Sequence, residues 1–357
     1  MIMENKPSIL LETRDSIKTF LLEAGEPGFR SEQVCDWLFT KRRFDLDGWT
    51  NISKKIKERL AEHFAFDFPH VIEKLDSIDG STKLLLGNGK HVFEAVILRY
   101  NNRVSLCVSS QVGCRLACRF CQTGKLGFVR HLSAAEILGQ FALAQNIIKN
   151  EERKISHVVF MGMGEPFDNY DNVIKTANQM INGFGMNPKN VTLSTSGLAP
   201  RIESLASDSR AALALSLHAC RDDLRNELMP INTRYNLAKL KEALLSYQKE
   251  TGRLITLEYI LIRDKNCGIR EAKELVRFIH GLRVKVNLIP FNAHPGMPYQ
   301  RPSDEVIREF QKYLSDRSIP APVRYSKGLD VSAACGQLAA KSAPSLAQPP
   351  VRANLMN

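Results

Sequence analysis

Strand-like and helix-like segments alternate along the chain from about residue 104 onward, and this alternation limits the possible folds more than any other feature. The candidate strands are the apolar segments 104–109, 157–161, 190–195, 212–217, 254–262 and 285–291, with a short last one at 322–325. Helical patterns fill the gaps; the clearest spans 133–149, where Ser133 and Glu136 form a capping box. Such alternation is typical of parallel βα units. Because the units are fewer than eight, we predict an α/β fold with a partial (β/α)6 barrel over 104–338, rather than a closed barrel or a doubly wound sheet.

The residues before this barrel divide into two further segments. Residues 1–65 contain three short helical patterns, 17–24, 31–41 and 51–63, and carry a dense set of basic side chains: Lys41, Arg42, Arg43, Lys54, Lys55, Lys57 and Arg59. A solvated helix face would explain any one of these charges, but their density predicts a basic helical accessory domain that binds RNA. Residues 66–103 are β-rich and contain the turn signals Asp79-Gly80, Asn88-Gly89 and Asn101-Asn102, which predict a β-hairpin linker segment. The tail 339–357 has the composition of a disordered extension.

Composition places the chain among ordinary globular proteins with an unusual charge. Apolar residues make up 44% and charged residues 24% of the 357 residues, which excludes a disordered or collagen-like chain. The 49 Lys and Arg against 38 Asp and Glu give a formal charge of +11, which favours a polyanionic partner. No long apolar stretch is present, and Glu4, Lys6, Glu12 and Arg14 stand where a secretory signal would be apolar. We therefore expect a cytoplasmic protein with no membrane partner.

Four of the eight cysteines lie within residues 107–121, and three of them form a C-x3-C-x2-C run at Cys114, Cys118 and Cys121. Clustered thiols in a long chain without an export signal indicate a metal site or catalysis rather than disulfides. Three thiolates alone do not complete a tetrahedral zinc site, so zinc would need Cys107 or a His as a fourth ligand. A [4Fe-4S] cluster explains three ligands better, because one iron then stays open for a small molecule that binds through amino and carboxylate groups.

Polar residues also follow the next three candidate strands. Residues 161–166 form a glycine-containing turn after the second strand, residues 194–197 end the third, and residues 216–218 end the fourth. A tight connection or a structural His would explain each of these alone. Four successive polar strand ends at one rim of a barrel instead predict a binding site.

These motifs together resemble the RlmN/Cfr family of radical S-adenosylmethionine (SAM) RNA adenosine methyltransferases. The matching stretches are 105–121, with Phe120 before the last cysteine, and 161–166, 193–197, 216–218, 229–232, 287–292 and 333–338. The resemblance implies the partial barrel of the radical SAM type and one [4Fe-4S] cluster on Cys114, Cys118 and Cys121. It also implies SAM contacts by Gly164, Glu165, Ser194, Ser216, Leu217, His218 and Asn292.

The same resemblance implies a catalytic sequence that uses two SAM molecules per turnover. One SAM methylates Cys335, and the second is cleaved reductively to give a radical that takes a hydrogen from the S-methyl group. The resulting carbon radical adds to an adenine ring, and Cys107 then attacks the Cys335 sulfur, which releases methylated RNA and leaves a disulfide. Glu94 matches the general base that removes the ring proton. A radical route is needed because the ring carbon, flanked by two nitrogens, is too electron-poor to attack a sulfonium methyl group. Cys35, Cys220 and Cys267 match no motif, and we interpret them as structural.

Alternatives remain at this point. Methylation of carbon 8, as in the Cfr branch, uses the same cysteines, but Gln111 through Cys114 and the basic N-terminal segment favour the RlmN branch and carbon 2. Other classes are a radical SAM enzyme for a peptide or small molecule and a non-catalytic iron-sulfur RNA-binding protein. The family pattern implies 23S rRNA and tRNA as substrates and an electron donor as a partner. We also expect the protein to be a monomer. Basic residues flank both reactive centres and predict phosphate contacts: Arg115, Arg119, Lys125, Arg130, Arg324 and Lys327.

Overall fold

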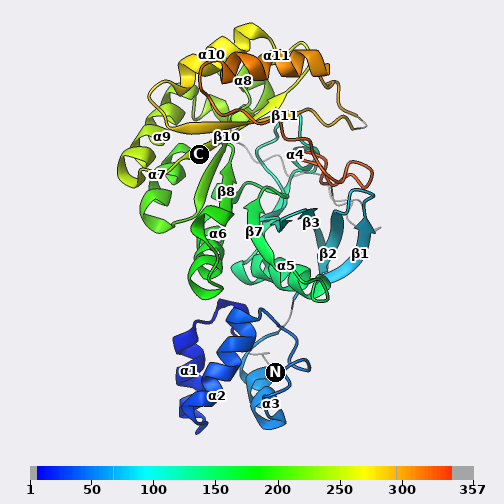
Figure 1. Cartoon of the computed structure of the whole chain (residues 1–357), viewed down its shortest axis with the longest axis vertical. Coiled ribbons are helices and arrows are strands. Elements are labelled where there is room, and N and C mark those ends of the chain that lie inside the picture. Colours follow the sequence, from blue (N-terminus) through cyan, green and yellow to red (C-terminus); the bar gives the residue numbers. More distant parts are fainter. Residues whose placement is uncertain (1–5, 67, 295, 340–357) are drawn as a thin grey trace.

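A curved sheet of nine strands, in the order β1-β2-β3-β4-β7-β8-β9-β10-β11, forms the centre of the molecule. The structure is a computed structural model, and it describes residues 6–66, 68–294 and 296–339. The strands of this sheet are β1 (His70–Asp76), β2 (Thr82–Asn88), β3 (His91–Tyr100), β4 (Arg103–Cys107), β7 (Ile155–Phe160), β8 (Val191–Thr195), β9 (Ala212–Ser216), β10 (Ile255–Leu261) and β11 (Val284–Pro290). Figure 1 shows the sheet in the upper part of the molecule, with the N-terminal helices below it.

The six strands from β4 to β11 are all parallel, which confirms the predicted partial barrel of six βα units. Their side chains are mostly buried because helices cover the outside of the barrel, and parallel strands covered in this way are apolar along their whole length. The helices of this part are α5 (Ala134–Ile147), α6 (Tyr170–Asn178), α7 (Ala199–Asp208), α8 (Asp222–Leu228), α9 (Leu237–Thr251), α10 (Ile269–Ile279) and α11 (Asp304–Ser315). The expected last strand at 322–325 is reduced to a single bridge between Leu288 and Val323.

The start of α5 shows how the sequence sets a helix boundary. Ser133 accepts a hydrogen bond from the backbone N–H of Glu136, and the Glu136 side chain accepts one from the backbone N–H of Ser133. The predicted capping box is therefore present, and it satisfies two backbone donors that the first helical turn leaves without partners.

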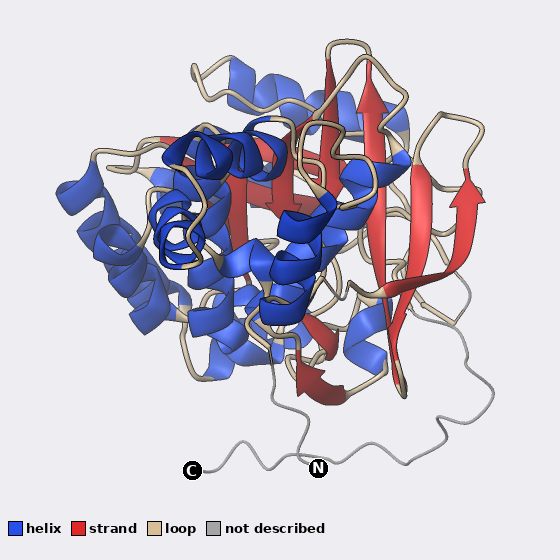
Figure 2. Cartoon of the chain, turned by 90° about the horizontal axis from the view of Figure 1, so that it is seen from below, coloured by secondary structure: helices blue, strands red, loops and turns tan. Residues whose placement is uncertain are grey.

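The three strands β1 to β3 are antiparallel and continue the barrel sheet without a break, because β3 pairs with β4. The predicted turn at Asn101 and Asn102 connects β3 to β4, where Tyr100 pairs with Arg103. In Figure 2 these strands stand at one side of the molecule, and most helices lie on the other side.

A second, two-stranded sheet lies within the connection after β4, and the sequence did not predict it. Its strands are β5 (Gln111–Gly113) and β6 (Phe128–His131), which pair antiparallel on either side of the cysteine run and the short helix α4 (Gln122–Lys125). The cysteines are thus presented from the end of a small hairpin rather than from a simple strand-to-helix loop.

The N-terminal helices α1 (Arg14–Glu23), α2 (Gly28–Cys35) and α3 (Lys54–His63) form a separate group below the barrel (Figure 1). They form where helical patterns were predicted, although α2 continues into a short π-helical turn, Asp36–Thr40. The Arg42 guanidinium donates hydrogen bonds to the carbonyl oxygens of Ile155, at 2.9 Å, and Phe184, at 2.8 Å. Ile155 is the first residue of β7, and Phe184 ends the helical segment that follows α6 and leads towards β8. The group therefore docks on the end of the barrel where the parallel strands begin.

None of the helices within the described residues is both long enough and apolar enough to cross a membrane. The tail for which disorder was predicted lies outside the described residues, apart from Ala339.

Candidate functional site

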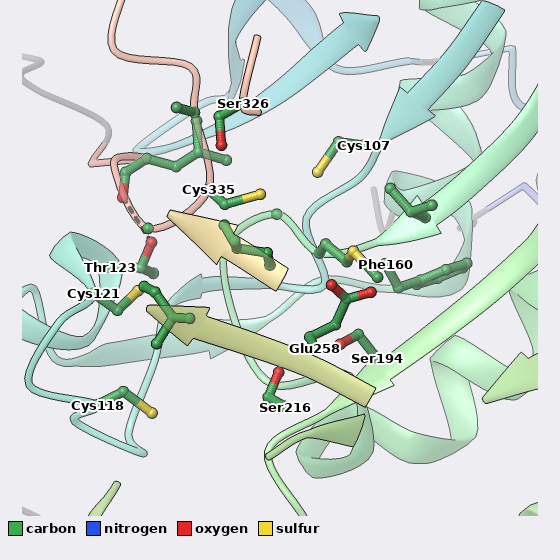
Figure 3. Close-up of a pocket in the computed structure, with 18 of the residues that line it drawn as sticks. Cys107, Cys118, Cys121, Thr123, Phe160, Ser194, Ser216, Glu258, Ser326 and Cys335 are labelled. Carbon is green, nitrogen blue, oxygen red and sulfur yellow. Dashed lines mark hydrogen bonds between the residues drawn. The ribbon is translucent and has the colours of Figure 1, made fainter. Parts of the chain in front are cut away.

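A pocket opens at the end of the barrel where the parallel strands finish (Figure 3). It gathers most of the candidate residues from positions far apart in the sequence: Cys107, Cys114, Cys118, Cys121, Gly164, Glu165, Ser194, Ser216, His218 and Cys335. The candidates Glu94, Leu217 and Asn292 do not line it. Thiols, hydroxyls and carboxylates from several strands and loops thus share one pocket.

The cysteine loop, residues 114–121, is held in place at its start and near its middle. The backbone N–H of Cys114 donates to the carbonyl oxygen of Gly127 at 2.8 Å, which closes the β5–β6 hairpin beneath the loop. The backbone N–H of Arg119 donates to the carbonyl oxygen of Leu228 at 2.9 Å, which ties the middle of the loop to α8. The loop is therefore positioned by backbone hydrogen bonds on two sides.

Burial keeps the three thiols of the cysteine loop neutral in the absence of a positive partner. It raises the pKa of Cys114 well above its usual value, that of Cys118 to about 12, and that of Cys121. Within the described ranges 6–66, 68–294 and 296–339, no three His, Cys, Asp or Glu side chains are already arranged as a metal-binding group. The donor chemistry nevertheless fits an iron-sulfur cluster, because a bound cation converts such thiols to thiolates and three of them lie on one loop at the pocket wall.

The turn after β7 requires glycine and places Glu165 at the pocket wall. Gly164 has a φ of +102°, and a side chain there would collide with Gln111. Glu165 is buried, and its carboxylate accepts hydrogen bonds from the backbone N–H groups of Ser196, at 2.8 Å, and Phe167, at 3.1 Å. Burial raises the pKa of Glu165, although these hydrogen bonds oppose the shift. Glu165 thus links the ends of β7 and β8.

A buried arginine that the sequence analysis missed fixes the neighbouring strand ends. Arg225 on α8 donates to the carbonyl oxygens of Ser196, Ser216 and Leu217 and to the Asn232 side chain, at 2.8 to 3.2 Å. The expected stretch 229–232 therefore includes a structural partner of this arginine. Leu217 is fully buried and contributes its backbone to this arrangement rather than a side chain to the pocket.

His218 lies beside this arginine and stays neutral. Burial first, and then the charge of Arg225, lower the pKa of His218 to about 3. Its Nδ1 atom accepts a hydrogen bond from the backbone N–H of Ile260 at 3.1 Å, and its ring meets Phe120 edge-on at 4.9 Å between centroids. One ring nitrogen is thus used to hold β9 against β10.

Cys107 and Cys335 lie in the same part of the pocket although 228 positions separate them (Figure 3). Cys107 ends β4 and is buried, which raises its pKa to about 12. Cys335 is exposed as a residue, but burial around its sulfur atom also raises the pKa of its thiol, and Arg324 opposes that shift. Asn292 donates to the carbonyl oxygen of Cys335 at 3.1 Å and to the Ser326 hydroxyl at 2.9 Å. Asn292 therefore holds the segment that carries Cys335, in a position beside the pocket rather than on its wall.

Glu94 is buried in β3 rather than solvated. Its carboxylate lies 3.4 Å from the Lys83 ammonium group, and it faces the same side of β3 as Val96, which lines the pocket. Burial raises the pKa of Glu94, while Lys83 opposes that shift.

Most basic residues expected to contact phosphates bond to the protein itself. Arg115 pairs with Asp168 at 2.9 Å, Arg130 with Glu136 at 2.7 Å, and Lys125 donates to the carbonyl oxygen of Gly296 at 2.6 Å. Lys327 donates to the carbonyl oxygens of Asp79 and Arg99, at 2.9 and 2.8 Å. These side chains hold the loops around the pocket, and phosphate contacts by them stay a prediction.

Two pocket residues carry no sequence motif. Glu258, in the fully buried strand β10, and Tyr325, on the segment that leads to Cys335, both line the pocket. A single Glu within an apolar strand and a single Tyr in a loop give no periodic or spacing pattern, so only the fold places them here.

Comparisons with known proteins identify the family of this chain. Residues 108–279 match the model of the radical SAM superfamily, and residues 9–66 match the model of the ribosomal RNA large subunit methyltransferase N-terminal domain. A dual-specificity RNA methyltransferase RlmN from Aliarcobacter butzleri is 39% identical, with 96% of this chain and 99% of the relative covered. One from Francisella tularensis is 40% identical, with 95% of this chain and 94% of the relative covered.

A solved structure shares the whole architecture. The crystal structure of a radical SAM methyltransferase from Sphaerobacter thermophilus superposes with a TM-score of 0.87 at 38% identity, covering 94% of this chain and 100% of that chain. The similarity therefore extends over nearly the whole chain.

Proposed function

Because the chain belongs to the RlmN family of radical SAM RNA methyltransferases, we propose that it methylates carbon 2 of an adenosine in 23S rRNA and in tRNA. Membership makes the chain a SAM-dependent enzyme that acts on RNA, and relatives named RlmN favour carbon 2 over carbon 8. The observation that carries the proposal is that Cys107, Cys335 and the cysteine loop line one pocket.

The residues for the two bound groups are available at the pocket wall. Cys114, Cys118 and Cys121 would hold a [4Fe-4S] cluster, which when bound supplies the electron that cleaves SAM. The backbone at Gly164 and the hydroxyls of Ser194 and Ser216 would contact SAM. An external electron donor must supply the electrons for both the cluster and the final disulfide.

The position of Cys335, an exposed residue at the pocket wall, suits the role of the methyl acceptor. Its sulfur would attack the methyl group of one SAM, and S-adenosylhomocysteine would leave. The S-methyl carbon would lose a hydrogen atom to the radical derived from the second SAM and form a bond to carbon 2 of the adenine, whose proton would go to the base. The buried thiol of Cys107 would then attack the Cys335 sulfur, the bond between sulfur and that carbon would break, one electron would return to the external electron carrier, and a Cys107–Cys335 disulfide would form. Their common position in the pocket supports this pairing.

Glu94 is proposed as the base that takes the proton from carbon 2. Burial raises the pKa of Glu94 against the opposing charge of Lys83, and a raised pKa makes a carboxylate a stronger base. Glu94 also faces the side of β3 that carries the pocket residue Val96.

Mass spectrometry of the protein and nucleoside analysis of RNA test the proposal together. We expect a methyl group on the peptide that contains Cys335, and loss of 2-methyladenosine from 23S rRNA and tRNA in a strain that lacks the gene. Cys335→Ala should abolish both signals. An unmethylated Cys335 together with unchanged methyladenosines in the deletion strain would contradict the proposal. That result would favour a non-catalytic RNA-binding protein.

A further inference from the structure

One carboxylate on the pocket wall has no role in the proposed reaction. Glu258 is 4% exposed and lies on β10, with its side chain directed into the pocket (Figure 3). Its Oε1 atom accepts a hydrogen bond from the Asn287 amide at 2.8 Å. Its Oε2 atom is buried and has no hydrogen-bond partner among the described residues. A buried carboxylate oxygen without a donor is costly, so this atom is available to a ligand that brings a donor.

The groups around Glu258 indicate which kind of ligand would bind there. Glu258 is paired in register with Ser216 on β9, and Ser194 lies on the next strand, β8. Figure 3 shows the Glu258 carboxylate and the hydroxyls of Ser194 and Ser216 on one wall, while Cys118 and Cys121 lie at another side of the pocket. The Arg324 guanidinium lies 3.8 Å from Oε1, so a positive charge accompanies the carboxylate. This wall offers hydrogen-bond acceptors to a neutral, hydroxyl-bearing group.

The chemistry of SAM fits this arrangement when its amino acid end lies at the cysteine loop. The open iron of a triply ligated cluster binds amino and carboxylate groups, so the nucleoside end of SAM extends across the pocket, away from Cys118 and Cys121. A ribose presents two neighbouring hydroxyl donors, and an acidic side chain is the group that dinucleotide-binding proteins use to accept from a ribose hydroxyl. The strand-end serines supply further polar contacts beside it.

We propose that Glu258 is a specificity-determining residue that accepts a hydrogen bond from a ribose hydroxyl of SAM. Asn287 fixes the orientation of the carboxylate by donating to Oε1, so that Oε2 faces the ligand. The proposal rests on the proposed function, because it assumes that SAM occupies this pocket. We therefore expect the pocket to bind SAM analogues that lack this hydroxyl more weakly than SAM, because such a ligand would leave the buried carboxylate unpaired.

This contact is tested by measuring binding affinity while the protein side chain and the ligand hydroxyl are each changed in turn. Cluster-reconstituted protein and its Glu258→Gln variant are compared in equilibrium dialysis with SAM and with its 2′-deoxy and 3′-deoxy analogues. Because Asn287 donates to Oε1, the amide oxygen of Gln occupies that position and its NH₂ group faces the ligand. We expect native protein to bind one deoxy analogue roughly 10-fold to 100-fold more weakly than SAM. The variant should bind SAM and that analogue with similar, reduced affinity.

Two controls separate a direct contact from damage to the fold. Glu274→Gln changes another buried carboxylate, 9% exposed and outside this pocket, and should keep the native preference for SAM. Iron content and the melting temperature of Glu258→Gln show whether the protein is folded; if it is not, Glu258→Asp, which keeps the charge but withdraws it, replaces it in the same cycle.

The outcomes are distinct from failure of the proposed function. A Glu258→Gln protein that discriminates against both deoxy analogues as strongly as native protein overturns the inference. So does a variant with native affinity for SAM and a raised KM for RNA, which would assign Glu258 to the adenosine of the RNA instead. RNA is absent from the binding experiment, so an enzyme that binds SAM through Glu258 but never methylates RNA would disprove only the proposed function.

Discussion

At the scale of single residues, Cys107 and Cys267 allow a matched test of the final step. Both are 8% exposed, but only Cys107 lines the pocket. Cys107→Ser removes the thiol that would release the product from Cys335. We therefore expect RNA to stay covalently attached to the protein, seen as a band that persists on a denaturing gel and disappears with nuclease. Cys267→Ser should release its RNA normally, and free RNA with Cys107→Ser would contradict the assigned role.

The Lys83–Glu94 pair makes a prediction about pH. Burial raises the pKa of Glu94, and Lys83 opposes this shift, so Lys83→Gln should raise the pKa further. A base acts in its ionised form, and the acid side of the pH profile of RNA methylation should therefore move to higher pH. The control is Lys74→Gln. Lys74 is exposed and pairs with Asp76, and both residues lie on β1, the strand next to the one that carries Lys83. An unmoved profile with Lys83→Gln would remove Glu94 as the base.

At the scale of elements, the β5–β6 hairpin positions the cysteine loop, and Gly113 is its tightest point. Gly113 has a φ of +74°, and a side chain there would collide with the carbonyl of Gly127, the same group that accepts from Cys114. Gly113→Ala should displace the loop. The reconstituted variant should then bind much less iron and lose most of the visible absorbance of the cluster, while the barrel stays folded. Iron analysis and circular dichroism measure the two effects.

Gly185→Ala is the control for this change. Gly185 also has a positive φ, +65°, but no atom lies within 4 Å of an added side chain, so only backbone strain of about 1–2 kcal/mol is expected. If Gly113→Ala binds as much iron as Gly185→Ala, the hairpin does not position the ligands.

The elements that could be predicted from the sequence are those with a repeated pattern. The parallel strands are buried on both faces and read as continuous apolar segments, and α5 is bounded by a capping box. β5 has only three residues and lies between two functional motifs, so its pairing with β6 has no periodic pattern. Glu258 and Arg225 could not be predicted from the sequence for a related reason. Each makes its contacts with strands that are distant in the sequence, and spacing along the chain does not reveal such contacts.

At the scale of the whole molecule, the N-terminal helices and the pocket lie at opposite ends of the barrel. The helices dock where the parallel strands begin, and the pocket lies where they end. Arg42 and Arg43, expected on an RNA-binding face, donate instead to barrel carbonyls, and Lys41 pairs with Asp36. The charge of +11 is therefore partly used inside the protein, and an RNA that reaches both ends must be large.

Arg42 is the point at which this docking can be tested. Arg42→Ala removes two hydrogen bonds and leaves the carbonyls of Ile155 and Phe184 without their donor, which should cost about 2–4 kcal/mol of docking free energy. We expect faster proteolysis between α3 and β1 and a raised KM for RNA, because the helices no longer hold the RNA in a fixed relation to the pocket. Reductive cleavage of SAM without RNA should be unchanged, since the pocket is distant. Lys54→Ala, at a side chain 90% exposed, should leave the proteolysis unchanged. A native KM in an Arg42→Ala protein whose helices have come loose would show that the N-terminal helices stabilise the barrel without contributing to RNA binding.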